Sequence, residues 1–218
     1  MSEKSITSLS TKRIIISFLL LAAVPAAALL MDRLIDHRWI SYMFSLNIFI
    51  SLLIMYDWNL FGIHYNRSKN DPFEAVIYTL IGAVLVYAWY WAGSHLLKAE
   101  ILLPPGSVLR MYGYARPGML AAFSFMQASA VNIGFKVLTD RFSVYGREFL
   151  SILLSAVTFG LLITLSYVPF SFSVLIPAYL YNMGITAIMS YLYNQSHSFF
   201  PGIMSLTAVY LAVMILSM

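Results

Sequence analysis

Seven stretches of mainly apolar residues, separated by short polar segments, make up most of this 218-residue chain. A membrane-spanning α-helix needs about 20 such residues. In an ordinary soluble domain about a quarter of the residues are charged, whereas here 10% are charged and 61% are hydrophobic. We therefore predict an all-α, polytopic transmembrane bundle of about seven spans, within a range of six to eight, and we exclude a soluble globular protein. The predicted spans are 14–31, 39–56, 73–97, 118–138, 149–168, 171–193 and 199–217.

The ends of two of these segments carry further signals. The first segment is longer than the apolar region of a typical signal peptide, and more spans follow it, so we expect a retained helix. The third segment opens with Asp71, Pro72 and Glu74, a combination typical of a helix start. It ends in Tyr87, Trp89, Tyr90 and Trp91, which predicts an aromatic belt at a membrane interface. The segment 98–117 between the third and fourth spans is predicted to be re-entrant or to lie on the membrane surface.

Thirteen Lys and Arg residues against nine Asp and Glu residues give a formal net charge of +4. No basic cluster is dense enough to predict binding of nucleic acid, so we interpret the charge as a determinant of membrane topology. One side would carry Lys4, Lys12, Arg13, Arg67, Lys69, Lys136, Arg141 and Arg147. The other side would carry Arg33, Arg38, Lys98, Arg110 and Arg116. The excess on the first side favours a cytoplasmic N-terminus.

Residues that carry chemistry are few. The chain has no cysteine, and the stretch from Phe149 to Met218 has no Asp, Glu, Lys or Arg. Functional intramembrane sites usually retain an ionisable residue despite its cost of at least ~2.5 kcal/mol for insertion. His37 and His64 fall in predicted loops, and His95 and His197 fall near span ends, where a histidine can face headgroups or water. We expect no metal site and no cofactor.

Uncharged polar residues do occur within the predicted spans. Asn47 and several serines are expected to hydrogen-bond between helices at ~1 kcal/mol or less each. Gln127, Asn132 and Asn182 have the same expected role, or they line a polar cavity. Small residues within the later spans are expected to let helices approach closely. These are Gly160, Ala178 and Gly184.

Two stretches of the C-terminal half show a motif-like order. One runs from Tyr191 through Asn-Gln-Ser-His-Ser to Phe-Phe-Pro-Gly-Ile203, where a helix ends, a polar turn follows and a new helix opens. The other begins at Arg141-Phe-Ser-Val-Tyr-Gly and continues to Phe159-Gly-Leu-Leu-Ile163. In order and spacing, about 118–213 resembles the CPBP family, the glutamic intramembrane proteases of the CAAX-processing and bacteriocin-processing type. The resemblance implies one membrane domain over 1–218, with N-terminal helices and a loop over 1–117 and a CPBP-like core over 118–218.

The residues at the family's functional positions differ from its motif. The resemblance places the paired glutamates and the arginine at Met126, Gln127 and Val131, and it places the two histidines and the asparagine at Ile163, Leu206 and Tyr210. Phe159 is retained from the Phe-x-x-x-His motif. None of the replacements can serve as the acid or base that peptide cleavage requires. The resemblance therefore implies a degenerate member with no catalytic residue, located in a bacterial cytoplasmic membrane.

Three functions remain open from the sequence. The first is an accessory, scaffold or regulatory subunit that lies in the bilayer and binds another integral membrane protein. The second is a component that binds or transports a small solute or lipid, since 16% of the residues are aromatic. The third is an active intramembrane protease that uses His95, Glu100 and His197, which would have to converge in space.

Overall fold

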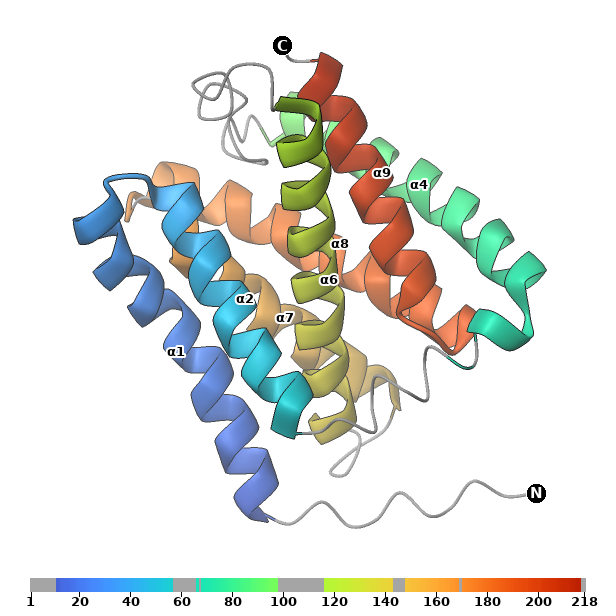
Figure 1. Ribbon diagram of the computed structural model, residues 1–218, viewed down its shortest axis with the longest axis horizontal. Coiled ribbons are helices and arrows are strands. Elements are labelled where there is room, and N and C mark those ends of the chain that lie inside the picture. Colours follow the sequence, from blue (N-terminus) through green and yellow to red (C-terminus); the bar gives the residue numbers. More distant parts are fainter. Residues whose placement is uncertain are drawn as a thin grey trace.

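The computed structural model describes residues 11–56, 66, 68–97, 116–142, 148–168 and 170–216 (Figure 1). These residues form helices and turns and contain no strand. The helices are α1 (Thr11–Ile35), α2 (Arg38–Tyr56), α4 (Pro72–His95), α6 (Arg116–Phe142), α7 (Glu148–Tyr167), α8 (Phe172–Ser196) and α9 (Phe200–Leu216). Each predicted span coincides with one of these helices to within four residues at either end. The all-α prediction is confirmed for this part of the chain.

Four of these helices are long and apolar enough to cross a membrane. They are α1 from Ile15 to Ile35, α4, α7 from Phe149 to Tyr167, and α8. Shorter apolar helices extend from Ile40 to Tyr56 in α2 and over the whole of α9. In lipid a continuous helix satisfies the hydrogen bonds of its own backbone. The length and apolarity of these helices indicate a membrane protein.

The helices surround α6, which runs through the middle of the bundle in Figure 1. This helix contacts α1, α2, α7, α8 and α9. Helices α1 and α2 lie side by side on one flank, while α4 packs on α9 and α8 on the other. Helix α6 is therefore the central element and α4 a peripheral one.

The central helix is buried on almost every side. Between Gln127 and Thr139, all but one of the side chains that the structure describes are buried, and Ser129 is half-buried. Helix α6 is the least apolar of the seven described helices. A helix enclosed by protein can carry more polar residues than a helix that faces lipid, because its polar groups find partners on the surrounding helices.

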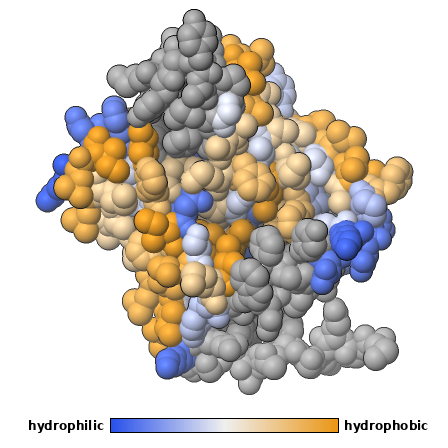
Figure 2. Space-filling view, in the orientation of Figure 1, coloured by the Kyte–Doolittle hydropathy of each residue, from blue (hydrophilic) through white to orange (hydrophobic). Residues whose placement is uncertain are grey.

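The peripheral helix α4 shows the opposite pattern. Its buried residues are Gly82, Val86 and Gly93, whereas Phe73, Leu80 and most of its other large apolar side chains are exposed. In the view of Figure 2, apolar residues cover much of the flanks of the molecule. The strongly hydrophilic residues gather mainly at the start of α4 and at the ends of α1, and a smaller group lies near the centre of this face. This distribution fits a bundle whose flanks face lipid and whose ends face water.

Small residues bring helices into close contact, as predicted. A Cβ atom on Gly160 of α7 would lie 3.0 Å from the backbone nitrogen of Met183 in α8. Gly184 of α8 packs directly against the indole of Trp89 in α4. Ala178 is fully buried. The prediction of close helix approach is confirmed for Gly160 and Gly184, and for Ala178 it stays a prediction.

The start of α4 follows the predicted capping pattern. The carboxylate of Asp71 accepts a hydrogen bond of 3.1 Å from the backbone N–H of Glu74, and Pro72 occupies the first helical position. The aromatic belt at the other end of α4 is only partly as predicted. Tyr87 and Trp91 are exposed, but the indole N–H of Trp89 donates to the carbonyl of Tyr181 at 3.0 Å. Trp89 therefore fastens α4 to α8 within the bundle.

Candidate functional site

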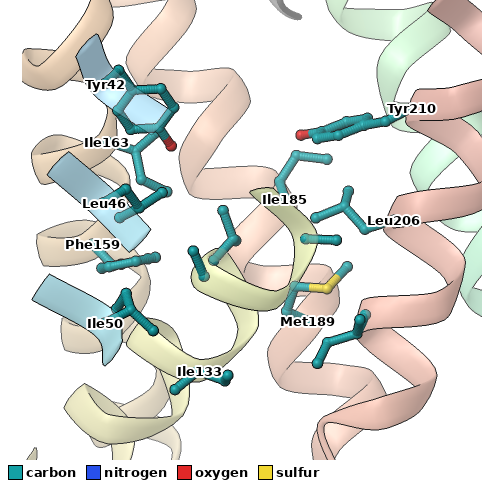
Figure 3. Close-up of a cluster of buried hydrophobic side chains, with 14 of the residues drawn as sticks. Tyr42, Leu46, Ile50, Ile133, Phe159, Ile163, Ile185, Met189, Leu206 and Tyr210 are labelled. Carbon is teal, nitrogen blue, oxygen red and sulfur yellow. The ribbon is translucent and has the colours of Figure 1, made fainter. Parts of the chain in front are cut away.

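Six of the seven degenerate motif positions lie in the buried core. Phe159 and Ile163 project from α7, and Leu206 and Tyr210 from α9, on opposite sides of α6 (Figure 3). Gln127 and Val131 are buried on α6 itself. Met126 differs from the others because 36% of its side chain is exposed. The six buried positions therefore belong to one interior region, and Met126 faces away from it.

The lower part of this interior is filled by closely packed apolar side chains. The ring of Phe159 lies so close to Gly134 of α6 that a Cβ atom there would be 2.5 Å from the ring Cζ atom. Leu206 is fully buried and Ile163 is 3% exposed. Packing of this kind leaves little room for a substrate.

Three contacts fix the relative height of the helices around α6. Gly134 meets Phe159 of α7 and Ile50 of α2, and the amide oxygen of Asn132 lies against Gly202 of α9. Eight residues of an α-helix span about 12 Å. We move eight residues along each helix from these contacts, towards the same end of the bundle. That step leads from Ile50 to Tyr42, from Phe159 to Tyr167, from Asn132 to Ser124, and from Gly202 to Tyr210. These four residues therefore lie at one level, and Gln127 lies about 4.5 Å from Ser124 along α6. We call this region the tyrosine level.

Aromatic side chains interact with one another at the tyrosine level. The rings of Tyr42 and Tyr167 have centroids 5.3 Å apart. The phenols of Tyr42 and Tyr210 point towards each other in Figure 3. The hydroxyl of Tyr181 in α8 lies close to that of Tyr210, but not in the geometry of a good hydrogen bond, and Tyr181 also lies near Tyr167. The level thus combines phenol groups from α2, α7, α8 and α9.

Three buried polar atoms at this level make no hydrogen bond of acceptable geometry with a described residue. They are Ser124 Oγ, Gln127 Oε1 and Tyr181 Oη. Ser124 and Tyr181 are fully buried, and Gln127 is 3% exposed. A buried polar atom without a partner costs about 1–3 kcal/mol, so such atoms commonly mark the place of a water molecule or ligand.

The two asparagines of the predicted polar cavity make protein contacts instead. The amide of Asn182 donates to Thr164 Oγ1 at 2.9 Å and to Tyr167 Oη at 3.0 Å, which links α8 to α7. The amide of Asn132 donates to the carbonyl of Ala128 in its own helix at 2.8 Å. Of the three residues predicted for the cavity, Gln127 alone presents an unpartnered buried oxygen in the described part of the chain.

The histidines that an active protease would use are far apart. His197 lies in the turn between α8 and α9, and Ser198 beside it shares a hydrogen bond of 2.8 Å with Ser68, just before α4 begins. His95 lies at the other end of the 24-residue α4. At ~1.5 Å per residue this separates the two histidines by roughly 35 Å. They cannot share a metal ion or a proton.

Other residues considered for such a site lie outside the described residues. These are Glu100 and His64. Residues 98–115 of the segment 98–117, which we predicted to be re-entrant or to lie on the membrane surface, also lie outside them, whereas Arg116 and Pro117 of that segment begin α6. Within the described residues no group of three or more His, Cys, Asp or Glu side chains could hold a metal ion.

Lys136 is a functional candidate that sequence reasoning missed. We predicted that it flanks a loop, but it lies inside α6 and is only 6% exposed. Its Nζ atom is 4.0 Å from the centroid of the Tyr193 ring in α8. Nearby, Thr139 and Ser155 share a hydrogen bond of 2.9 Å between α6 and α7. The predicted span 118–138 already contains this residue, but the helix continues to Phe142, so Lys136 lies inside the helix and not at its end.

Comparisons with models of known protein families, with curated proteins and with solved structures give no match for this chain. The resemblance to the CPBP family therefore remains a prediction that rests on the motif-like residues alone.

Proposed function

We propose that this chain is a non-catalytic integral membrane protein that serves as an accessory, scaffold or regulatory subunit of another membrane protein. One observation carries the proposal: bulky apolar side chains fill the core at the positions where the resemblance expects catalytic groups. Ile163 and Leu206 stand for the two histidines and are buried in contact with the core. Neither side chain can transfer a proton or bind a metal ion.

The polar content of the interior supports the same proposal. Among the side chains that the structure describes, the buried polar ones are serine, threonine, asparagine, glutamine and one lysine, in addition to the tyrosines. Hydrolysis of a peptide within the membrane requires a group that activates water and a site prepared for the developing charge. The described interior offers helix-to-helix hydrogen bonds instead, such as that between Asn182 and Thr164.

The proposal includes an architecture and a location. Seven helices would cross a bacterial cytoplasmic membrane, with the N-terminus on the cytoplasmic side and residues 118–218 forming a CPBP-like core. Without Lys136, which is buried, the side of the N-terminus keeps seven of its eight Lys and Arg residues against five on the other side. The charge bias still points in the same direction, although it is smaller.

Cross-linking in the native membrane tests the proposed role. A photoreactive residue would replace Leu80 or Val84, which are exposed on the outer face of α4, and Val86, which is fully buried in the same helix, would be the matched control. We expect the two outer positions to give one defined cross-linked partner and the control position to give none. Purification in mild detergent should then yield the same partner in a fixed ratio. A lone monomer without any cross-linked protein would contradict the proposal.

A further inference from the structure

The unpartnered oxygens at the tyrosine level indicate a bound molecule, which we call the guest. Ser124 and Gln127 are spaced by three residues on α6, so they lie on the same face of that helix. Tyr181 Oη, on α8, likewise makes no hydrogen bond of acceptable geometry with a described residue. In native proteins the great majority of buried polar atoms are paired with protein or with an ordered molecule. Three such atoms at one level of the bundle are better explained by one bound group than by three separate defects.

The chemistry of the surrounding side chains defines this group. The oxygen Oε1 of Gln127 can only accept a hydrogen bond, so the guest must donate one. The hydroxyls of Ser124 and Tyr181 can donate or accept, so the guest can also accept. No buried Asp, Glu or His is found among the described side chains, so no acidic group at this level balances a cationic guest. The one nearby charge in the described part of the chain is the guanidinium of Arg38, one turn from the tyrosine level on α2, and it donates to the carbonyl of Val168 at 3.2 Å. A hydroxyl group is neutral and satisfies both requirements.

We propose that the tyrosine level binds a neutral hydroxyl group between α6 and the surrounding helices. A water molecule or the alcohol of a membrane lipid can supply this hydroxyl. The tyrosine rings form apolar walls around it, and the three unpartnered oxygens hold it by hydrogen bonds. This site differs in chemistry from a proteolytic centre, because no group in it activates water.

The direction in which one substitution shifts the midpoint of thermal unfolding tests the proposal. Gln127→Met keeps the length of the side chain but removes its oxygen. If a hydroxyl pairs with Gln127, the substitution breaks a hydrogen bond, and the midpoint of thermal unfolding should fall by about 2–4 °C. If nothing pairs with Gln127, the substitution removes an unsatisfied buried group, and the midpoint should rise or stay unchanged. Gln195→Met, at an exposed position near the end of α8, is the matched control and should change nothing.

Two milder variants keep the test decisive if Gln127→Met does not fold. Ser124→Ala and Tyr181→Phe each remove a single oxygen from the site. A fall of the midpoint in Gln127→Met supports the proposal, and a fall in either milder variant supports it where Gln127→Met does not fold. An unchanged or higher midpoint in Gln127→Met overturns it, as does the same result in both milder variants where Gln127→Met does not fold.

Two further measurements distinguish the sources of the hydroxyl. Native mass spectrometry of the wild-type protein would detect a retained lipid alcohol as added mass, which Gln127→Met should lose. Added 1-decanol should then raise the midpoint of delipidated wild-type protein, while decane, which lacks the hydroxyl, should not. A wild-type protein without added mass or a response to decanol, but with the predicted fall in the variants, holds water at this site.

Discussion

Helices α4 and α6 differ in apolarity and in burial, and the more apolar of the two is the more exposed. Helix α4 is apolar enough to span a membrane, yet only 11% of the residues in its most apolar window are buried. Helix α6 is the least apolar of the described helices, yet its described side chains from Gln127 to Thr139 are buried, apart from the half-buried Ser129. In a soluble domain the more apolar helix would be the more buried one.

This difference shows which solvent the molecule is built for. Lipid tails are as apolar as leucine, so exposing Leu80 and Val84 on α4 to the bilayer costs nothing, whereas in water it would. Polar side chains need hydrogen-bond partners where water is absent, and those of α6 face other helices that can provide them. The hydroxyl of Thr139 shares a hydrogen bond with Ser155 of α7, whereas the Nδ2 group of Asn132 donates to Ala128 in its own helix. Polarity therefore marks the centre of this bundle and apolarity marks its periphery.

A charge on the outer face of α4 should have the largest effect. Val84 lies at the middle of α4 with 69% of its side chain exposed, so Val84→Asp would place a carboxylate at mid-membrane. We expect a cost of about 3 kcal/mol for membrane insertion of α4, measured as the inserted fraction in a translocation assay. Leu96→Asp is the control, because Leu96 is 75% exposed just beyond the end of the helix. Equal insertion of both variants would mean that α4 does not cross lipid.

A larger side chain inside α6 should have the next largest effect. Gly134→Leu would drive new atoms into the ring of Phe159 and the side chain of Ile50. Overpacking of this kind costs about 2 kcal/mol and should lower the midpoint of thermal unfolding by about 4–8 °C. A Cβ atom on Gly118, near the start of the same helix, would meet no atom within 4 Å. Gly118→Leu should therefore leave the midpoint unchanged, and a similar loss in both variants would argue against close packing at Gly134.

Loss of the hydrogen bonds of Asn182 should have the smallest effect of the three. Asn182→Leu would leave Thr164 and Tyr167 without the amide that joins α8 to α7. Such bonds between membrane helices contribute about 1 kcal/mol, so we expect a fall of about 2–4 °C in the unfolding midpoint. Asn47 donates only to Met43 in its own helix. Asn47→Leu should change the midpoint less, and the reverse order would refute the link between α7 and α8.

The helices themselves could be predicted from the sequence, because apolar runs of the right length have few other structures available in lipid. The start of α4 was also predictable, since Asp71 and Pro72 act within one turn. The close approach at Gly160 followed from residue size alone. These features depend on neighbours in the sequence, or on a single residue type.

The arrangement of the helices could not be predicted in the same way. Hydropathy gave no sign that α6 is the central helix, because a more polar span is also compatible with a position at the edge. Lys136 was expected at a loop, since an enclosed lysine cannot be recognised without the helices around it. Adjacent residues on a helix point about 100° apart, so a motif match could not show that Gln127 faces the core and Met126 faces away.

The tyrosine level illustrates the same limit for the candidate site. Tyrosines are common at membrane interfaces, so aromatic content alone suggested belts as much as a ligand site. Tyr42, Tyr167 and Tyr210 come from three helices that are far apart in the sequence, and their convergence depends on helix order and height. The contacts of Gly134 and Asn132 set those heights, and no local sequence pattern predicts these contacts.

Labelling of the unmodified protein in its membrane tests the contrast between α4 and α6 most directly. A lipid-soluble, carbene-generating photolabel would be activated in membranes that contain the wild-type chain, and the labelled residues would be mapped by peptide mass spectrometry. We expect labelling of the outer face of α4, at Leu80 and Val84, and none in α6 from Gln127 to Thr139. Labelling of that part of α6 to the same extent as α4, or an unlabelled α4, would contradict the proposed position of the two helices.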